Sequence, residues 1–173
     1  GGRVSVINNA TFTKASTGTS NVTGILLFSN AGTFNCNAGN FLFGDANAGG
    51  TFTNAGSLVF NTGTFSVGTG CIYNHNSGST ISGTGSFANA GTANFNINQT
   101  FPSTILLSST GNIAGAGDLI INNPFTIQGS ITGGGLLNIK AAATWNSGLI
   151  TRNVLIDAGQ SLTIATATEK QLQ

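Results

Sequence analysis

An apolar repeat in the last third of the chain restricts the folds that are open to it. The sequence from 109 to 164 divides into three lines of 19, 18 and 19 residues. Each line carries an isoleucine at two equivalent places, and a bulky apolar residue at a third, looser one. A fixed period with apolar columns is typical of repeat architectures, in which each repeat buries its apolar face only against its neighbours. The columns are Ile113, Ile131 and Ile150; Ile121, Ile139 and Ile156; and Phe125, Trp145 and Leu162.

The N-terminal half has a similar pattern. Short segments rich in Phe, Ile, Val and Thr alternate with Asn-Ala-Gly turns that begin at positions 30, 37, 47, 54 and 89. Asn and Gly reach positive φ at low cost, so we expect them to turn the chain. Turns this frequent leave no room for a helix of ordinary length. Aligning residues 31–43 with 49–60 predicts that Phe34 stacks on Phe52, and Phe41 and Phe43 on Leu58 and Phe60.

Two all-β architectures fit these strands. An antiparallel sandwich or barrel also has short strands at this spacing. A parallel β-solenoid additionally requires like residues to recur in register once per coil, and the isoleucine columns meet this requirement. We therefore predict one β-solenoid domain over residues 1–173, with about 18 residues per coil and about nine coils. Pro102 cannot donate a ladder hydrogen bond, so we expect a bulge or loop there.

The small number of charged residues limits the classes of function that the chain can have. Charged residues make up 5% of the chain, against roughly 25% in typical domains. Polysaccharide-cleaving chemistry needs paired carboxylates or a metal held by several of them, so we expect no enzyme activity. A net charge of +1 gives no electrostatic reason to bind nucleic acid, and the longest apolar run, residues 24–28, is too short to insert in a membrane. The only carboxylates are Asp45, Asp118, Asp157 and Glu169.

The remaining reactive residues predict neither a metal nor a cofactor. Cys36 and Cys71 should lie two coils apart, roughly 9.6 Å, which exceeds the reach of a disulfide. His75, the only histidine, is expected to be a solvated turn residue because its neighbours in sequence are asparagines. Lys140 and Asp157 follow the second isoleucine column by one residue. They should therefore form a surface ion pair, worth at most about 1 kcal/mol.

A Thr-x-Thr pattern is the one candidate binding surface. Stacked on successive coils, these residues would form two files of outward hydroxyls on a flat face. Such an array resembles the surface of β-solenoid ice-binding proteins. The alternative is that Thr is simply a good solvent-facing strand residue. The residues of the candidate surface are Thr11, Thr13, Thr33, Asn35, Thr51 and Thr53.

Several stretches resemble the β-helical repeat regions of large secreted bacterial surface proteins of the adhesin kind. They are the Asn-Ala-Gly-Thr-Phe turns and the lines at 129–139 and 155–164. The resemblance implies a structural or adhesive rod, secreted or on the cell surface, as a segment of a longer array or a fibre subunit. Unpaired end coils should favour self-association. Ice binding and carbohydrate binding or cleavage remain the alternatives, with ice or a glycan as candidate partner surfaces.

Overall fold

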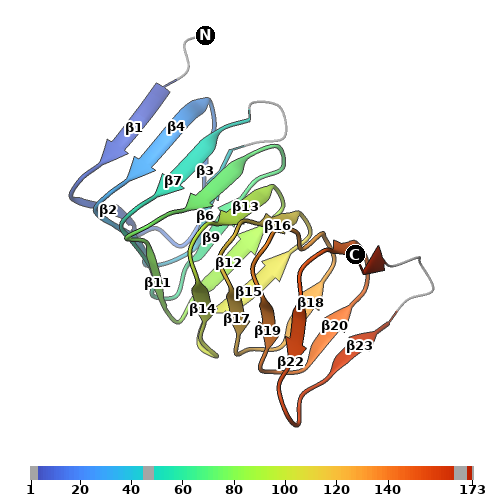
Figure 1. The fold of residues 1–173 in the computed structure, drawn as a ribbon. Helices are drawn as coiled ribbons and strands as arrows, with labels where there is room; N and C mark the ends of the chain where they lie inside the picture. The colour runs from blue at the N-terminus through green and yellow to red at the C-terminus, as the bar shows by residue number, and fades with distance from the viewer. Residues whose placement is uncertain (1–3, 45–48, 166–170, 173) are drawn as a thin grey trace.

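The computed structural model describes residues 4–44, 49–165 and 171–172 and shows an all-β parallel β-solenoid. The chain winds through three short strands in most coils, and successive coils stack along one axis, with β1 at one end of the stack and β23 at the other (Figure 1). Within the described residues no helix is long and apolar enough to cross a membrane. The solenoid has about 21 residues per turn and about seven turns, so the predicted architecture is confirmed and the predicted coil was too short.

The strands form three walls of the solenoid. Sheet A contains β1 (Val4–Asn8), β4 (Ile25–Asn30), β7 (Thr51–Asn54), β10 (Ile72–His75), β13 (Thr92–Phe95) and β16 (Asn112–Ala114). Sheet C contains β3 (Thr19–Val22), β6 (Asn40–Phe43), β9 (Thr64–Val67), β12 (Ser86–Asn89), β15 (Leu106–Ser109), β18 (Phe125–Ile127), β20 (Ala143–Trp145) and β23 (Leu162–Ile164).

Two sheets share the third wall. Sheet B contains β2 (Thr11–Lys14), β5 (Thr33–Cys36), β8 (Ser57–Phe60) and β11 (Thr80–Gly83). Sheet D follows it with β14 (Gln99–Phe101), β17 (Leu119–Ile121), β19 (Leu137–Ile139) and β22 (Val154–Ile156). Pro102 lies just after β14, outside the ladder, as predicted. The remaining pair, β21 (Leu149–Ile150) with β24 (Gln171–Leu172), continues the wall of sheet A.

The C-terminal register agrees with two of the three predicted columns. Single bridges join Ile113 to Ile131 and Ile131 to Ile150, and the column from Ile121 to Ile156 is also in register. The third column was wrong, because Trp145 pairs with Ile127 and Ile164, two residues away. Residues two apart on a strand face the same side. The predicted column therefore assigned each side chain to the correct side of its strand and was wrong only about its partner on the next coil. The column actually formed is Phe125, Ala143 and Leu162.

The N-terminal register differs from the prediction. Successive coils here are as much as 24 residues apart, so the alignment at 18 matched strands from different walls. Phe52 pairs with Phe28 in sheet A, not with Phe34. The strands of these coils have mostly four residues, against three in the C-terminal coils, and the turns also vary in length, whereas the alternation within each strand is unchanged. In sheets B and C the observed pairs are Phe34 with Leu58, Cys36 with Phe60, Phe41 with Phe65 and Phe43 with Val67.

Aromatic rings fill the N-terminal half of the core. Rings in register stack along the axis, for example Phe28 on Phe52 with centroids 4.6 Å apart. Rings from different walls meet edge to face, as Phe34 and Phe41 do at 4.7 Å. Aromatic pairs favour these two geometries, and each adds about 0.5–1.5 kcal/mol beyond its buried area. Towards the C-terminus the core becomes aliphatic, with Trp145 as the large exception.

Glycine allows the stacked turns to approach each other closely. A Cβ atom at Gly56 would lie 2.1 Å from the carbonyl oxygen of Gly32, and one at Gly32 would lie 2.1 Å from that of Ala10. Neither glycine has a positive φ, and no described residue other than glycine has one. The expectation that asparagine turns the chain through positive φ was therefore wrong. In the Asn-Ala-Gly turns that begin at Asn30 and Asn54, glycine supplies space between coils.

Replacing Gly56 with alanine tests this packing. The new methyl group would overlap backbone that cannot move aside, and overpacking of this kind costs about 1–3 kcal/mol. Gly134→Ala is the matched control, because a Cβ there meets nothing within 4 Å. We expect urea unfolding to show a clear loss of stability for Gly56→Ala and little change for Gly134→Ala. Equal midpoints for the two variants would refute the explanation.

Candidate functional site

A chain of hydrogen bonds between asparagine side chains runs through the core of the first three coils. The Asn8 side-chain amide donates to Asn30 Oδ1 at 2.6 Å, and that of Asn30 donates to Asn54 Oδ1 at 2.7 Å. All three residues are buried and end successive strands of sheet A. Because buried amides need partners, this arrangement fixes how the three coils align. The asparagines of the turns therefore stabilise the stack from inside.

His75 occupies the next place in this column and is completely buried. The prediction that His75 is a solvated turn residue was wrong. His75 belongs to β10, in which the inward side chains of Tyr73 and His75 alternate with the outward side chains of Ile72 and Asn74. The Tyr73 hydroxyl lies 2.9 Å from His75 Nδ1, and Asn54 Nδ2 donates to that hydroxyl at 3.5 Å. His75 Nε2 has no hydrogen-bond partner in the described structure. The core therefore encloses the Tyr73–His75 pair completely.

Burial shifts the pKa values of both residues away from their charged forms. Desolvation lowers the pKa of His75 from 6.5 to about 4 and raises the pKa of Tyr73 above its ordinary value, with the Asn54 hydrogen bond opposing the latter shift. At neutral pH both side chains are therefore uncharged. This is the state that an enclosed polar pair requires.

The His75 pKa predicts a specific acid sensitivity. Since the folded pKa lies below the unfolded value of 6.5, the unfolded chain binds a proton first as the pH falls. Stability is full above pH 6.5 and is lost between 6.5 and 4, by on the order of 3 kcal/mol. His75→Phe should remove this slope, because Phe95 fills the same column on the next coil. Unfolding free energies measured from pH 4.5 to 7.5 should differ in slope between the two proteins. Parallel curves would contradict the prediction.

Two buried cationic side chains contact the backbone of stacked turns and do not form a binding site. Arg152 donates to the carbonyl oxygens of Thr132, Gly117 and Gly115, at 2.8, 2.9 and 2.9 Å. Desolvation lowers the pKa of Arg152, and nearby Asp118 opposes this shift. Arg152, which lies in a third turn, thus holds together carbonyl groups from two turns of the preceding coils.

Lys14 does the same at the other end of the solenoid. Its ammonium group donates to the carbonyl oxygens of Ser16, Gly18 and Ala38 and to the Ser16 hydroxyl. Both cations therefore compensate unpaired backbone acceptors.

The other charged residues that the structure describes in the C-terminal half also have structural partners. Lys140 and Asp157 form the predicted ion pair at 3.3 Å, and both are partly exposed. Asp118 accepts a hydrogen bond from the backbone N–H of Leu136 at 2.8 Å. No group of three or more His, Cys, Asp or Glu side chains suited to a metal occurs among the described residues. Cys36 and Cys71 are both buried, and the structure does not join them in a disulfide.

Removing the Arg152 guanidinium tests its role. Arg152→Met leaves three carbonyl groups without their charged donor, and we expect a loss of about 2–4 kcal/mol. Lys140→Met removes an exposed ion pair instead and should cost at most about 1 kcal/mol. Chemical denaturation of both variants provides the comparison. Equal losses would show that Arg152 does not stabilise the turns.

The predicted Thr-x-Thr surface is divided between two walls. Thr11 pairs with Thr33 and Thr13 with Asn35 in sheet B. Thr51 and Thr53 lie in sheet A instead, beside Leu27 and Ser29 of β4 and Ile72 and Asn74 of β10. The assumed 18-residue coil placed them in the wrong wall. A continuous file through all six residues is therefore not formed.

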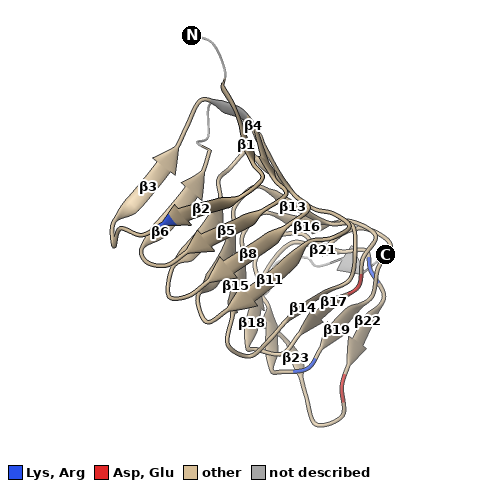
Figure 2. Ribbon diagram, turned by 90° about the vertical axis from the view of Figure 1, so that its left-hand side faces the viewer, with Lys and Arg blue, Asp and Glu red and all other residues tan. Residues whose placement is uncertain are grey.

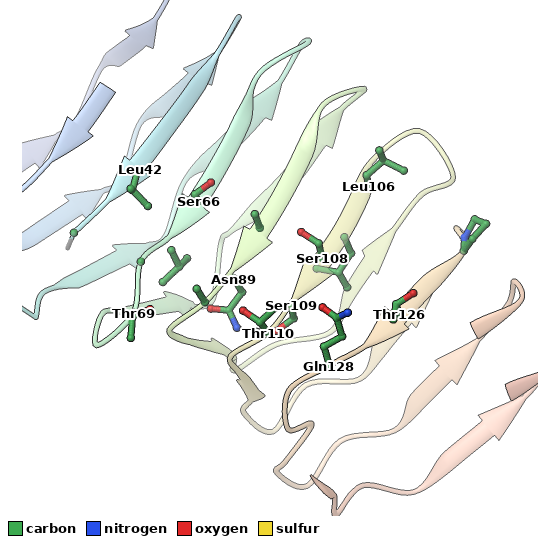
Figure 3. A pocket seen from close by; sticks show the side chains of 17 residues that line it. Leu42, Ser66, Thr69, Asn89, Leu106, Ser108, Ser109, Thr110, Thr126 and Gln128 are labelled. Carbon is green, nitrogen blue, oxygen red and sulfur yellow. Dashed lines mark hydrogen bonds between the residues drawn. The ribbon is translucent and has the colours of Figure 1, made fainter. Parts of the chain in front are cut away.

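A different surface, on the outer face of sheet C, contains a pocket of about 740 Å³. One outward residue from each of five consecutive strands lines it, and its margin is formed by turns that include Thr69 and Thr110 (Figure 3). Leu106, which is 59% exposed, projects beside this file. The residues of the file, from β6 to β18, are Leu42, Ser66, Ala88, Ser108 and Thr126.

None of the described residues that line the pocket has a charged side chain. The described charged residues lie elsewhere: Lys14 is near one end of the solenoid, and the others are in the C-terminal coils, as Figure 2 shows. Alternation along each strand identifies these lining residues as outward. Only the register shows that they form one file.

In comparisons with known proteins, no family model, curated protein or solved structure matches this chain.

Proposed function

We propose that this chain is a structural and adhesive segment of an extracellular β-solenoid rod. The observation that carries the proposal is the eight-stranded parallel ladder of sheet C, which runs from β3 in the first coil to β23 in the last complete one. Backbone hydrogen bonds link each coil to the next along this wall, so the coils resist separation. A rod of this kind holds a surface at a distance and presents long, repetitive walls for contact.

The charged groups that the structure describes support a structural role over a catalytic one. Arg152 and Lys14 bind backbone carbonyls, Asp118 binds a backbone N–H, and Asp157 pairs with Lys140. The histidine is enclosed in the core. Each of these groups is committed to holding coils together, whereas a general acid or base has to reach a substrate.

The last coil supports self-association of the rod. Ile156 and Ile164 belong to inward columns, yet they are 42% and 62% exposed. Strands β3 and β23 are the edges of sheet C, and unpaired strand edges are templates for further pairing. We propose that a coil from a second copy of this chain stacks on this surface and extends the ladders.

Electron microscopy combined with sedimentation at rising concentration tests this proposal. We expect filaments of uniform width that lengthen with concentration, and Ile164→Lys should shorten them because it places a charge on the stacking surface. Leu155→Lys is the matched control, since Leu155 is 45% exposed on the same coil and lies between inward Val154 and Ile156. Single particles at every concentration, or equal effects of the two variants, would reject end-to-end assembly.

A further inference from the structure

The pocket on sheet C has the shape of a site for an extended ligand. Its file of outward residues crosses five strands, and four steps of about 4.8 Å give a length of about 19 Å. The volume of about 740 Å³ lies in the range of sites that enclose sizeable ligands. The step between strands is close to the length of one pyranose ring along a sugar chain. A linear polysaccharide can therefore place equivalent groups over successive coils.

The chemistry of the lining suits a neutral ligand rich in hydroxyl groups. Ser66, Ser108 and Thr126 offer hydroxyls that both donate and accept, and Gln128 adds an amide. Leu42 and Leu106 provide apolar surface for the C–H faces of sugar rings. Among the residues that the structure describes, no charged side chain lines the pocket, so an ionised ligand would lose hydration without gaining a counter-charge there.

A buried acceptor lies at the margin of the same pocket. The Asn89 amide donates to Ser109 Oγ and to the Asn112 carbonyl, both at 3.0 Å. Its Oδ1 has no partner, although the residue is only 3% exposed. Figure 3 shows Asn89 among the lining residues, near Thr69 and Thr110. Asn89 is an inward residue of β12, so this unpaired acceptor belongs to the core behind the pocket and does not contact a ligand on the outward file.

We infer that the pocket on the outer face of sheet C binds a segment of a neutral polysaccharide. This inference rests on the proposed role of the rod as a contact surface and names the class of its ligand. The segment lies across the strands of sheet C, parallel to the solenoid axis. Its hydroxyls exchange hydrogen bonds with the Ser and Thr file, and its ring faces rest on the leucines.

Titration of the labelled protein, followed by NMR, tests the inference. The probes are cellohexaose, xylohexaose, mannohexaose and laminarihexaose, with hexagalacturonate as a charged comparison. We expect saturable shifts of outward residues of β9, β12 and β15 with at least one neutral hexaose. Hexagalacturonate should cause none. Ser108→Glu places an unpaired carboxylate in the lining and should weaken binding by more than about tenfold. Thr126→Glu provides an independent second variant on the same file.

Ser82→Glu is the matched control, because Ser82 is an exposed outward residue of β11 in sheet B. It should bind like the unmodified chain. The inference is overturned if none of the neutral hexaoses binds, if hexagalacturonate binds equally well, or if the two pocket variants bind normally. Filament length measured on the same samples separates the two proposals. A variant that loses glycan binding but forms normal filaments tests the pocket proposal alone. A variant that forms short filaments but binds glycan normally tests only the proposed stacking of the end coils.

Discussion

The structure depends on backbone hydrogen bonds between parallel strands of neighbouring coils. These bonds fix a constant rise of about 4.8 Å per coil, and every other contact has to fit that distance. Aromatic rings stack at it, as Phe28 and Phe52 do, and asparagine amides bridge it, as Asn30 and Asn54 do. Where turns stack closely at this distance, there is no room for a side chain. This explains why glycine occupies position 32, which lies against Ala10, and position 56, which lies against Gly32.

The core changes its means of stabilisation along the axis. In the first coils, buried asparagines and aromatic rings share the interior. In the last coils, isoleucine and leucine columns dominate, and Arg152 ties the turns together. Tyr73 and His75 lie where the asparagine column of sheet A ends, since the column of Asn54 continues through His75 to Phe95. Enclosure keeps His75 uncharged, so one polar column passes into an apolar one without an unpaired charge.

The outer wall formed by sheet C carries the ligand contact proposed for this chain. Charged side chains in the described chain are few and are used between turns or in a single surface pair. The outer face of sheet C is left with hydroxyl, amide and apolar groups, arranged in a file across successive strands. Such a face offers repeated weak contacts rather than one strong site, which suits a rod that gains affinity from many contacts made at once.

The sequence by itself determined the fold class, the inward or outward direction of most strand residues, two isoleucine columns and the Lys140–Asp157 pair. These features follow from alternation and from coils of nearly constant length, and both are local. Only the tertiary structure decided the coil length in the N-terminal half, the wall occupied by Thr51 and Thr53, the burial of His75 and the pocket on sheet C. The physical reason is that strands and turns can both take up extra residues without disturbing the alternation within each strand. The partner of each strand therefore depends on the summed lengths of the strands and turns before it, which no local pattern records.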